Sequence, residues 1–178
     1  MTTQIEERYT YAVTAQNLRS NTRDCAPIGA VDVLTAAGWS KSRMGQSLLR
    51  LAGEYDGAAR AGCDTPMDAA MFVGKLRTLP EVRNQLGLLL AQWGVDNAYD
   101  QALRVIAWWL YKTCSKCHGR GYDVVPGTGR LSGKMCRPCS GSGQAPIPCG
   151  ETGRRMASYM DDCISRARQS IRRGLGQL

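Results

Sequence analysis

Residues 114–144 read CSKCHGRGYDVVPGTGRLSGKMCRPCSGSGQ. This stretch contains one eight-residue pattern twice, Cys-x-x-Cys-x-Gly-x-Gly, with 18 residues between the two cysteine pairs. Two residues between cysteines let a tight turn direct both sulfur atoms at one ion, and two such turns complete a tetrahedron. The pairs, Cys114 with Cys117 and Cys136 with Cys139, therefore match the spacing of a structural zinc site.

All four expected ligands are thiolates, so a bound ion would keep no open position for water or substrate. A closed site of this kind is structural rather than catalytic, and we predict one Zn²⁺ in a four-cysteine site. The glycines that follow each pair allow left-handed turns and leave backbone N–H groups free to face the sulfur atoms. Because residues 113–148 contain little apolar material, we expect zinc to supply their folding energy. Replacement of Cys136 by Ser should then disorder this segment and release the helix that follows it.

The positive charge of the chain is confined to its last part. The chain has 178 residues and a net charge of +8, and 43% of its residues are hydrophobic, enough to bury a core in one or two domains. Residues 1–111 carry eleven basic and eleven acidic side chains, so the whole excess lies in residues 112–178. Such a concentration is typical of proteins that bind an anionic partner, above all nucleic acid. A solvated basic surface is the alternative interpretation.

The spacing of apolar residues predicts a mainly α fold, a helical body with an inserted small zinc-binding segment of four cysteines and a C-terminal basic helix. In the body, Ser40 can cap a helix with apolar residues at steps of three and four, and Pro80 suits the first turn of another. Further helices are expected at residues 31–37, 66–79 and 97–112. The last of these is apolar nearly all round, which is typical of a core helix. The predicted regions are a polar, flexible N-terminal arm, the helical body, the zinc-binding segment and the basic amphipathic helix, at residues 1–28, 29–112, 113–148 and 149–178.

The final helix, predicted over residues 151–173, carries an apolar stripe with arginines on both sides of it. More basic residues lie beside the expected zinc ligands. Together these are the candidates for nucleic-acid contacts: Lys116, Arg120, Lys134, Arg137, Arg154, Arg155, Arg166, Arg168, Arg172 and Arg173.

The sequence offers little for catalysis or membrane insertion. His118 is the only histidine, so no catalytic pairing with serine or cysteine can be proposed, and phosphate-binding loops and zinc-protease motifs are lacking. We therefore expect that the protein is not an enzyme. No apolar run approaches the length of a membrane span, and we expect no secretory signal and no membrane partner. The cysteines should then lie in a reducing compartment.

The sequences CSKCHGRGY and CRPCSGSGQ, with the basic spacer between them, resemble the zinc-binding segment of lambdoid phage late-gene antitermination proteins, the Q family of lambda type. A second similarity lies upstream, in VDVLTAAGWSKSRMGQSLLRLAG at residues 31–53. The order of a neutral helical body, a zinc segment and a basic helix is also similar to that of the family.

This resemblance implies a transcription antitermination factor. Such proteins bind double-stranded DNA within a phage late promoter, engage host RNA polymerase paused near it, and let the elongation complex read through pauses and terminators. The resemblance places the zinc ligands at the four cysteines named above, and the protein in the cytoplasm of the bacterial host, at the nucleoid. It assigns no residue that contacts DNA or polymerase, because no local motif anchors such residues.

Two other interpretations stay open. The repeated unit also resembles the cysteine-rich region of DnaJ-type co-chaperones, although that region has four such units and this chain has two, without the His-Pro-Asp of a J domain. The alternative function is therefore a zinc-dependent protein-interaction or co-chaperone-like module. A nucleic-acid-modifying enzyme is the third interpretation.

Overall fold

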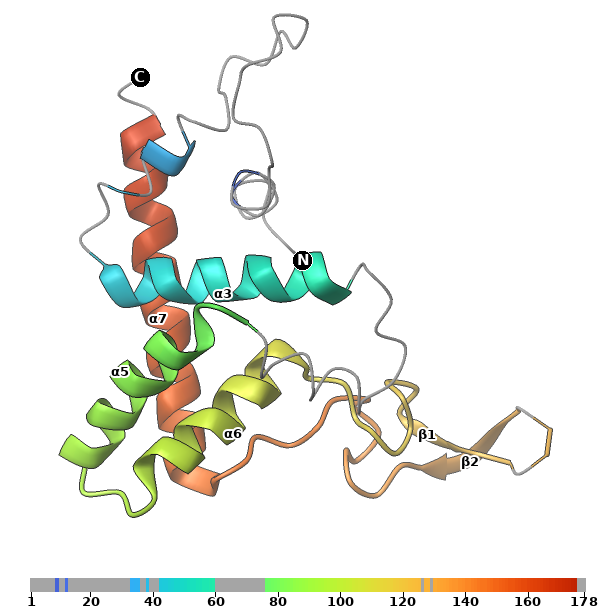
Figure 1. Ribbon diagram of the computed structural model, residues 1–178. Helices are drawn as coiled ribbons and strands as arrows, with labels where there is room; N and C mark the ends of the chain where they lie inside the picture. The colour runs from blue at the N-terminus through green and yellow to red at the C-terminus, as the bar shows by residue number, and fades with distance from the viewer. Residues whose placement is uncertain are drawn as a thin grey trace, which may run out of the picture.

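The structure is a computed structural model, and it describes residues 9, 12, 33–35, 38, 42–59, 76–125, 127, 128 and 130–175. This part of the chain is mainly helical with one two-stranded sheet, which confirms the predicted fold class (Figure 1). Its elements are α3 (Arg43–Ala59), α5 (Leu79–Gln92), α6 (Ala98–Leu110), β1 (Tyr122–Val124), β2 (Leu131–Met135) and α7 (Gly150–Leu175).

Helix α3 contains the apolar repeat that the sequence predicts. Leu48, Leu51 and Tyr55 recur at steps of three and four, so they lie on one face, and all three are buried. The predicted cap of this helix, Ser40, lies outside the described residues.

Helices α5 and α6 pack against each other, and a side chain of α3 forms hydrogen bonds with the residue that precedes α5. Pro80 stands in that first turn, as predicted. The carboxylate of Glu54, near the end of α3, accepts hydrogen bonds from the backbone N–H and the hydroxyl of Thr78, at 3.0 and 2.6 Å. A side chain of α3 thus accepts a hydrogen bond from a backbone N–H at the start of α5, which has no acceptor within its own helix. Close packing of the two helices depends on Gly87, because the ring of Tyr99 occupies the space that a Cβ would need.

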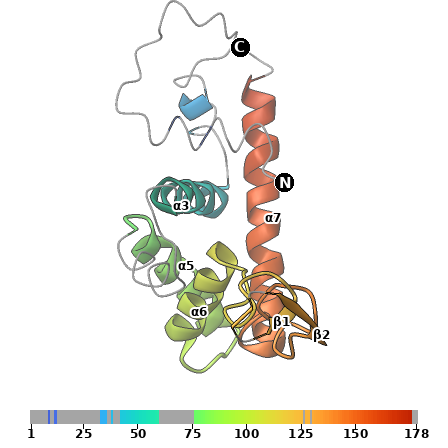
Figure 2. The same cartoon turned by 90° about the vertical axis from the view of Figure 1, so that its right-hand side faces the viewer.

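Helix α7 is long and crosses α3 (Figures 1 and 2). The crossing is close because Gly45 of α3 faces the backbone of α7, and a Cβ on Gly45 would collide with the carbonyl oxygen of Cys163. The hydroxyl of Ser42 donates a hydrogen bond of 3.2 Å to the same oxygen. The predicted helix at residues 151–173 is therefore present, and its apolar stripe packs on α3 and α6.

Helix α6 is less enclosed than its composition predicts. Its buried residues, Ala98, Ala102, Val105 and Ile106, form a single face. Trp108 and the two residues after it are only partly buried, so the prediction of a core helix holds for one face alone. Leu103, Trp109 and Leu110 are partly buried against the same main core.

Three other predicted regions lie partly outside the described residues. Tyr9 and Ala12, in the predicted N-terminal arm, are helical and buried, and the rest of residues 1–28 lies outside the described part. Residues 33–35 are helical, as expected. Most of the predicted helix at 66–79 is also outside the described residues. None of the described helices has the length and hydropathy needed to cross a bilayer.

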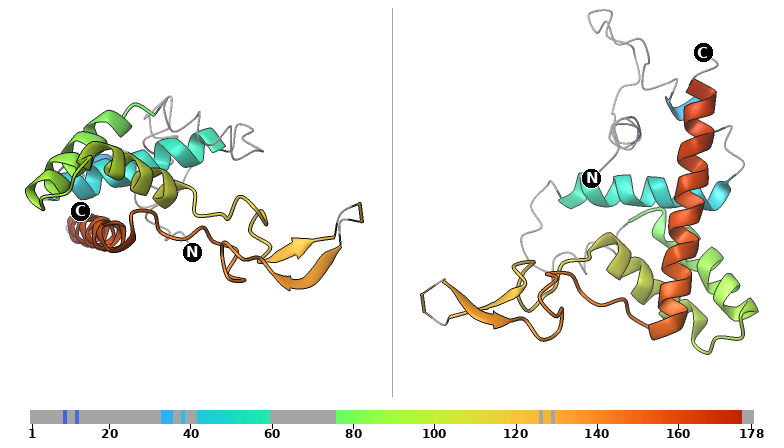
Figure 3. Two further views of the ribbon diagram at one scale, coloured as in Figure 1. Left: turned by 90° about the horizontal axis from the view of Figure 1, so that it is seen from below. Right: turned by 180° about the vertical axis from the view of Figure 1, so that it is seen from behind.

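The sequence did not predict the hairpin within the cysteine segment. Strands β1 and β2 pair in antiparallel fashion, with Tyr122 opposite Met135 and Val124 opposite Leu131. Figure 3 shows this hairpin extending away from the helices. The glycine within β2 and a bulged register hide the alternation that identifies longer strands.

Candidate metal centre

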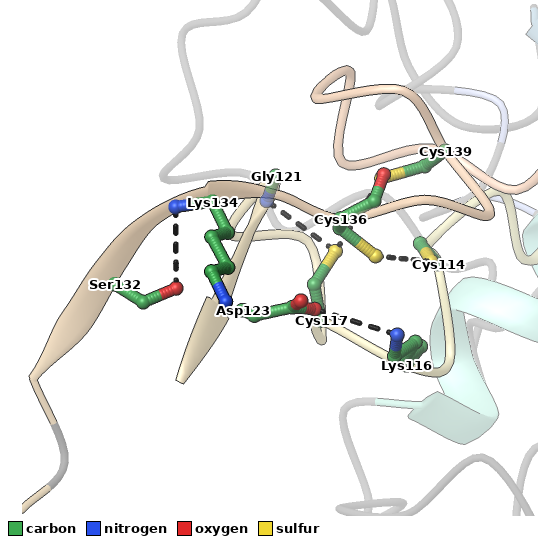
Figure 4. A network of polar contacts seen from close by, with 9 residues as sticks. All are labelled: Cys114, Lys116, Cys117, Gly121, Asp123, Ser132, Lys134, Cys136 and Cys139. Carbon is green, nitrogen blue, oxygen red and sulfur yellow. Dashed lines mark hydrogen bonds and ion pairs between the residues drawn. The ribbon is translucent and has the colours of Figure 1, made fainter. Parts of the chain in front are cut away.

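The four predicted ligand cysteines lie close together, in the segment of the chain that connects α6 to α7. Cys114 and Cys117 lie on the chain that leaves α6, and Cys136 and Cys139 follow strand β2 (Figure 4). Their Sγ atoms all lie within 4.8 Å of one another, and all four residues are buried. The sequence spacing therefore brings together a set of thiols that could hold a metal ion.

The distances between the sulfur atoms fit tetrahedral coordination. The Sγ atoms of Cys114 and Cys136 are 4.0 Å apart, and those of Cys117 and Cys139 are 3.6 Å apart. An ion bonded to four sulfur atoms at about 2.3 Å requires neighbouring sulfur atoms to be about 3.8 Å apart. The two measured separations bracket this value, so the donor set and its geometry suit a tetrahedral metal.

The two repeats are arranged as matched halves around the cluster. The backbone N–H of Cys114 donates to the carbonyl oxygen of Gly143 at 2.9 Å, and that of Cys136 donates to Gly121 at 2.8 Å. Each repeat thus bonds, from its first cysteine, to the last glycine of the other. The close sulfur pairs also join equivalent positions, 22 residues apart. The sequence repeat becomes an approximate twofold arrangement that delivers one pair of sulfur atoms from each side.

Glycine is required where the two halves touch. A Cβ on Gly121 would collide with the carbonyl oxygen of Gly141, and one on Gly143 would collide with that of Gly119. All four residues have positive φ angles, between 74° and 84°. Only glycine combines this conformation with such close backbone contact at little cost. The glycines of the motif therefore let the two cysteine turns approach each other.

Backbone N–H groups and burial act in opposite directions on the thiols. The N–H of Gly121 donates to the Sγ of Cys117 at 3.3 Å. Burial raises the pKa of Cys136 to about 12, helped by the neighbouring Cys139 thiol. Burial would also raise the pKa of Cys139, but the N–H of Gly143 donates to this sulfur, and its pKa falls to about 7. Any metal that binds must displace the protons that the cluster still holds, so binding is favoured by higher pH.

The cluster is the whole core of its segment. Among the described residues of 113–148, the four cysteines are the only apolar residues that are buried. The two ends of the segment are held against each other, because the N–H of Ala145 donates to the carbonyl oxygen of Lys112 at 2.7 Å and Thr113 pairs with Gln144. A metal would therefore bind these loops together where side-chain packing does not.

The predicted basic residues near the cluster are all exposed, but they differ in their contacts. Lys116 forms an ion pair of 3.5 Å with Asp123 of strand β1 (Figure 4). Arg120, Lys134 and Arg137 form no ion pair with any described residue. Three cationic side chains near the hairpin and cluster are thus not neutralised by an ion pair within the described part of the chain.

The arginines of α7 form two groups at opposite ends of the helix. At its start, the guanidinium of Arg155 lies 3.9 Å from the ring centroid of Trp93, and Arg154 pairs with Glu151 at 3.1 Å. Both side chains are exposed, yet each already has an intramolecular partner. Arg155 therefore contributes to the attachment of α7 to the end of α5 as well as to the surface charge, whereas the pair of Arg154 lies within α7 itself.

The second group occupies the last part of α7. Arg166 bonds to the carbonyl oxygen of Asp162 and to the Sγ of Cys163, and Arg168 is half-buried, which lowers its pKa. Arg172 and Arg173 are exposed in the last turn and form no ion pair within the described part of the chain. The helix dipole also favours cations at this end. These two residues are the most available cations of the helix.

Sequence reasoning missed two features of this region. It placed Trp108 in a core helix, whereas its Nε1 donates a hydrogen bond of 2.8 Å to Ala145 in the cysteine segment. It also missed the hairpin between the cysteine pairs. Of the described cysteines outside the cluster, Cys163 is buried and Cys149 is half-buried just before α7. The structure leaves His118 on an exposed turn with a positive φ of 48°.

Comparisons with known proteins do not place the chain in a family. No family model, no curated protein and no solved structure matches it.

Proposed function

We propose that this protein is a phage transcription antitermination factor. In this proposal it binds DNA at a late promoter and loads onto host RNA polymerase, which then reads through pauses and terminators. The observation that carries the proposal is the buried cluster of four cysteines, built from two matched Cys-x-x-Cys-x-Gly-x-Gly repeats and surrounded by basic side chains. The resemblance of these repeats to the lambda-type Q family supplies the biological context.

The resident metal in this proposal is one zinc ion. Cys114, Cys117, Cys136 and Cys139 would hold it, and their number and type suit zinc. With four protein ligands the ion would supply a crosslink between the two repeats and no catalytic chemistry. The role assigned here needs no catalysis, and the protein would act in the cytoplasm of the bacterial host, at the nucleoid.

DNA binding is assigned to the basic residues after position 112. Arg172 and Arg173 at the end of α7, and Arg120, Lys134 and Arg137 near the cluster, are exposed and unpaired among the described residues. Side chains of this kind contact phosphates, which gives affinity and salt dependence but no sequence specificity. The body from residue 1 to 111 is neutral overall, so the anionic partner would be contacted by the second part of the chain.

A second candidate function is a zinc-dependent protein-interaction module, similar to a co-chaperone. The observation that favours it is the exposed apolar surface of the hairpin beside the cluster. Such a module would bind unfolded proteins with little dependence on salt and would leave transcription unchanged.

Terminator readthrough tests the proposal directly. Purified bacterial RNA polymerase would transcribe a template that carries a phage late promoter, from the genome that encodes this protein, and a downstream terminator. The protein should increase readthrough from this promoter and not from an unrelated one. A Cys136→Ser variant should lose the effect. A Cys149→Ser variant should keep it, because Cys149 lies outside the cluster and serves as the matched control.

Measuring the metal content tests zinc binding separately from antitermination. Elemental analysis should give one zinc per chain for the wild type and for Cys149→Ser, and less for Cys136→Ser. Zinc-loaded protein that fails to increase readthrough, yet prevents aggregation of an unfolded client protein, would reject antitermination in favour of the second candidate.

A further inference from the structure

The β1–β2 hairpin concentrates exposed apolar side chains. Six large hydrophobic residues are exposed in the described part of the chain. Four of them lie in or beside the hairpin: Tyr122, Val125, Leu131 and Met135. Large exposed apolar groups that gather in one place mark an interaction site more often than single ones do.

Three of these side chains share one face of the hairpin. Tyr122 is the direct partner of Met135, and cross-strand partners lie on the same face. Leu131 is the direct partner of position 124, which stands two residues after Tyr122 on β1, so the regular spacing of β1 places Leu131 on the same face despite the bulge in β2. Tyr122, Leu131 and Met135 are 41, 52 and 62% exposed. A Cβ on Gly133, between the last two, would have no heavy atom within 4 Å, so this position is open to solvent.

The opposite face and the borders of the hairpin are polar and mainly basic. Asp123 and Lys134 lie on the other side from the apolar face, and Asp123 is paired with Lys116 (Figure 4). The cations around the hairpin are exposed: Arg120, Arg130, Lys134 and Arg137. The surface that a partner would meet is therefore an apolar strip with cationic side chains around it.

The position of the hairpin leaves this strip accessible. Figure 3 shows the hairpin extending from the molecule, with no described helix packed on it. A two-stranded hairpin alone is only marginally stable in water. Here the base of the hairpin is fixed, because Met135 is followed directly by the cluster residue Cys136.

We propose that the apolar face of the hairpin, Tyr122, Leu131 and Met135, docks into an apolar groove with acidic borders on host RNA polymerase. The inference rests on the proposed function for the identity of this partner. Its chemistry follows from the hairpin itself: the apolar strip requires a groove of similar kind, and the positive border requires acidic residues around it.

The composition of the strip favours a protein over nucleic acid. Proteins that hold single strands stack bases on aromatic rings, and this face has one tyrosine beside a leucine and a methionine. Methionine and tyrosine are enriched at protein interfaces, where their side chains adapt to an apolar surface.

Affinity measurements with matched variants test the proposal. A Leu131→Ser/Met135→Ser variant removes two exposed side chains of the strip, and Leu88→Ser removes a comparable exposed leucine (56%) from α5. Binding of each full-length protein would be measured to purified core RNA polymerase and to late-promoter DNA. The hairpin variant should bind polymerase about tenfold more weakly or worse. Its DNA affinity, zinc content and melting temperature should match those of the wild type, and Leu88→Ser should behave as the wild type in every assay.

The outcomes separate this inference from the proposed function. A wild-type protein that does not bind polymerase rejects both. If the wild type binds and the hairpin variant binds equally well, the proposed function stands and the hairpin inference is wrong. A hairpin variant that loses affinity for DNA, or for an unfolded client, but not for polymerase also overturns it.

A footprint on the unmodified protein gives an independent check. Brief hydroxyl-radical labelling oxidises exposed methionine thioethers, so Met135 should react in the free protein. Addition of core polymerase should protect it at least about threefold, because a docked side chain loses most of its solvent contact. Met156 and Met160 are fully buried and serve as internal controls. Unchanged labelling of Met135 in a saturated complex would contradict the inference.

Discussion

The indole Nε1 of Trp108 donates a hydrogen bond of 2.8 Å to the carbonyl oxygen of Ala145. This bond joins α6 to the chain that leaves the cysteine cluster. The ammonium group of Lys112 lies 5.2 Å from the centroid of the same ring, and the carbonyl oxygen of Lys112 accepts a hydrogen bond from the N–H of Ala145. One tryptophan therefore connects the helical body with the segment that carries the candidate metal site.

Replacing Trp108 by Phe should loosen this connection without emptying the cluster. The smaller phenyl ring would keep part of the packing but lack the N–H donor, and loss of this hydrogen bond is expected to lower the free energy of unfolding by about 1 kcal/mol. Amide hydrogen exchange should become faster around residues 143–147, while zinc content stays the same. Trp109→Phe is the control, because Trp109 packs against the main core. Equal exchange in the two variants would show that the bond does not fix the segment.

Loss of one cluster cysteine should unfold the segment and spare the helices. Without a metal, residues 113–148 have no apolar core beyond the cysteines among the residues that the structure describes, so Cys136→Ser or chelation should make this segment sensitive to protease. Limited proteolysis with mass spectrometry would map the cleavage sites. Cleavage confined to residues 113–148 is the expected result, and Cys149→Ser should resist protease as the wild type does.

The structure changes one expectation about this experiment. The sequence suggested that loss of zinc would also release the last helix. However, the buried stripe of α7, including Met156, Met160 and Ile171, belongs to the main core and packs on α3 and α6. Helix α7 should therefore stay attached, and far-UV circular dichroism of the metal-free protein should keep most of its helical signal.

The repeat glycines should be as necessary as the cysteines. Alanine at Gly121 or Gly143 would need a left-handed conformation, at roughly 1–2 kcal/mol, and would collide with a carbonyl oxygen of the other repeat. Each variant should lower the zinc affinity, measured by competition with a chromogenic chelator, by about tenfold or more, an order of magnitude for about 1.4 kcal/mol. Gly133→Ala is the matched control, because its Cβ would point into open space. A similar zinc affinity in all three variants would rule out close contact between the repeats.

The sequence was sufficient to predict those parts of the fold that follow from a repeated local pattern of residues. The spacing of the cysteines predicted the cluster, apolar periodicity predicted α3 and α7, and Pro80 predicted the start of α5. It could not predict how the two repeats pair, because the bonds from Cys114 to Gly143 and from Cys136 to Gly121 join distant positions. It also missed β1 and β2, whose glycine and bulged pairing give no clear alternation. The exposed apolar hairpin, the main unexpected feature, follows from that pairing.

The structure also refines which arginines of α7 should be tested for DNA binding. Arg166 and Arg168 are among the candidates from the sequence, but Arg168 is half-buried and Arg166 bonds to its own helix. Their replacement would alter packing as well as charge. Arg172 and Arg173 are exposed in the last turn and unpaired among the described residues, so their replacement changes mainly the surface charge.

An Arg172→Ala/Arg173→Ala variant should bind late-promoter DNA more weakly, with less dependence on salt. Each phosphate contact adds about 0.9 to the slope of log K against log salt concentration, so two lost contacts should reduce that slope by about 2. Fluorescence anisotropy at several salt concentrations would measure it. Arg77→Ala/Arg104→Ala removes the same charge from two exposed positions of the neutral body. If both double variants change the slope equally, the effect comes from net charge, and the end of α7 is not where the DNA binds.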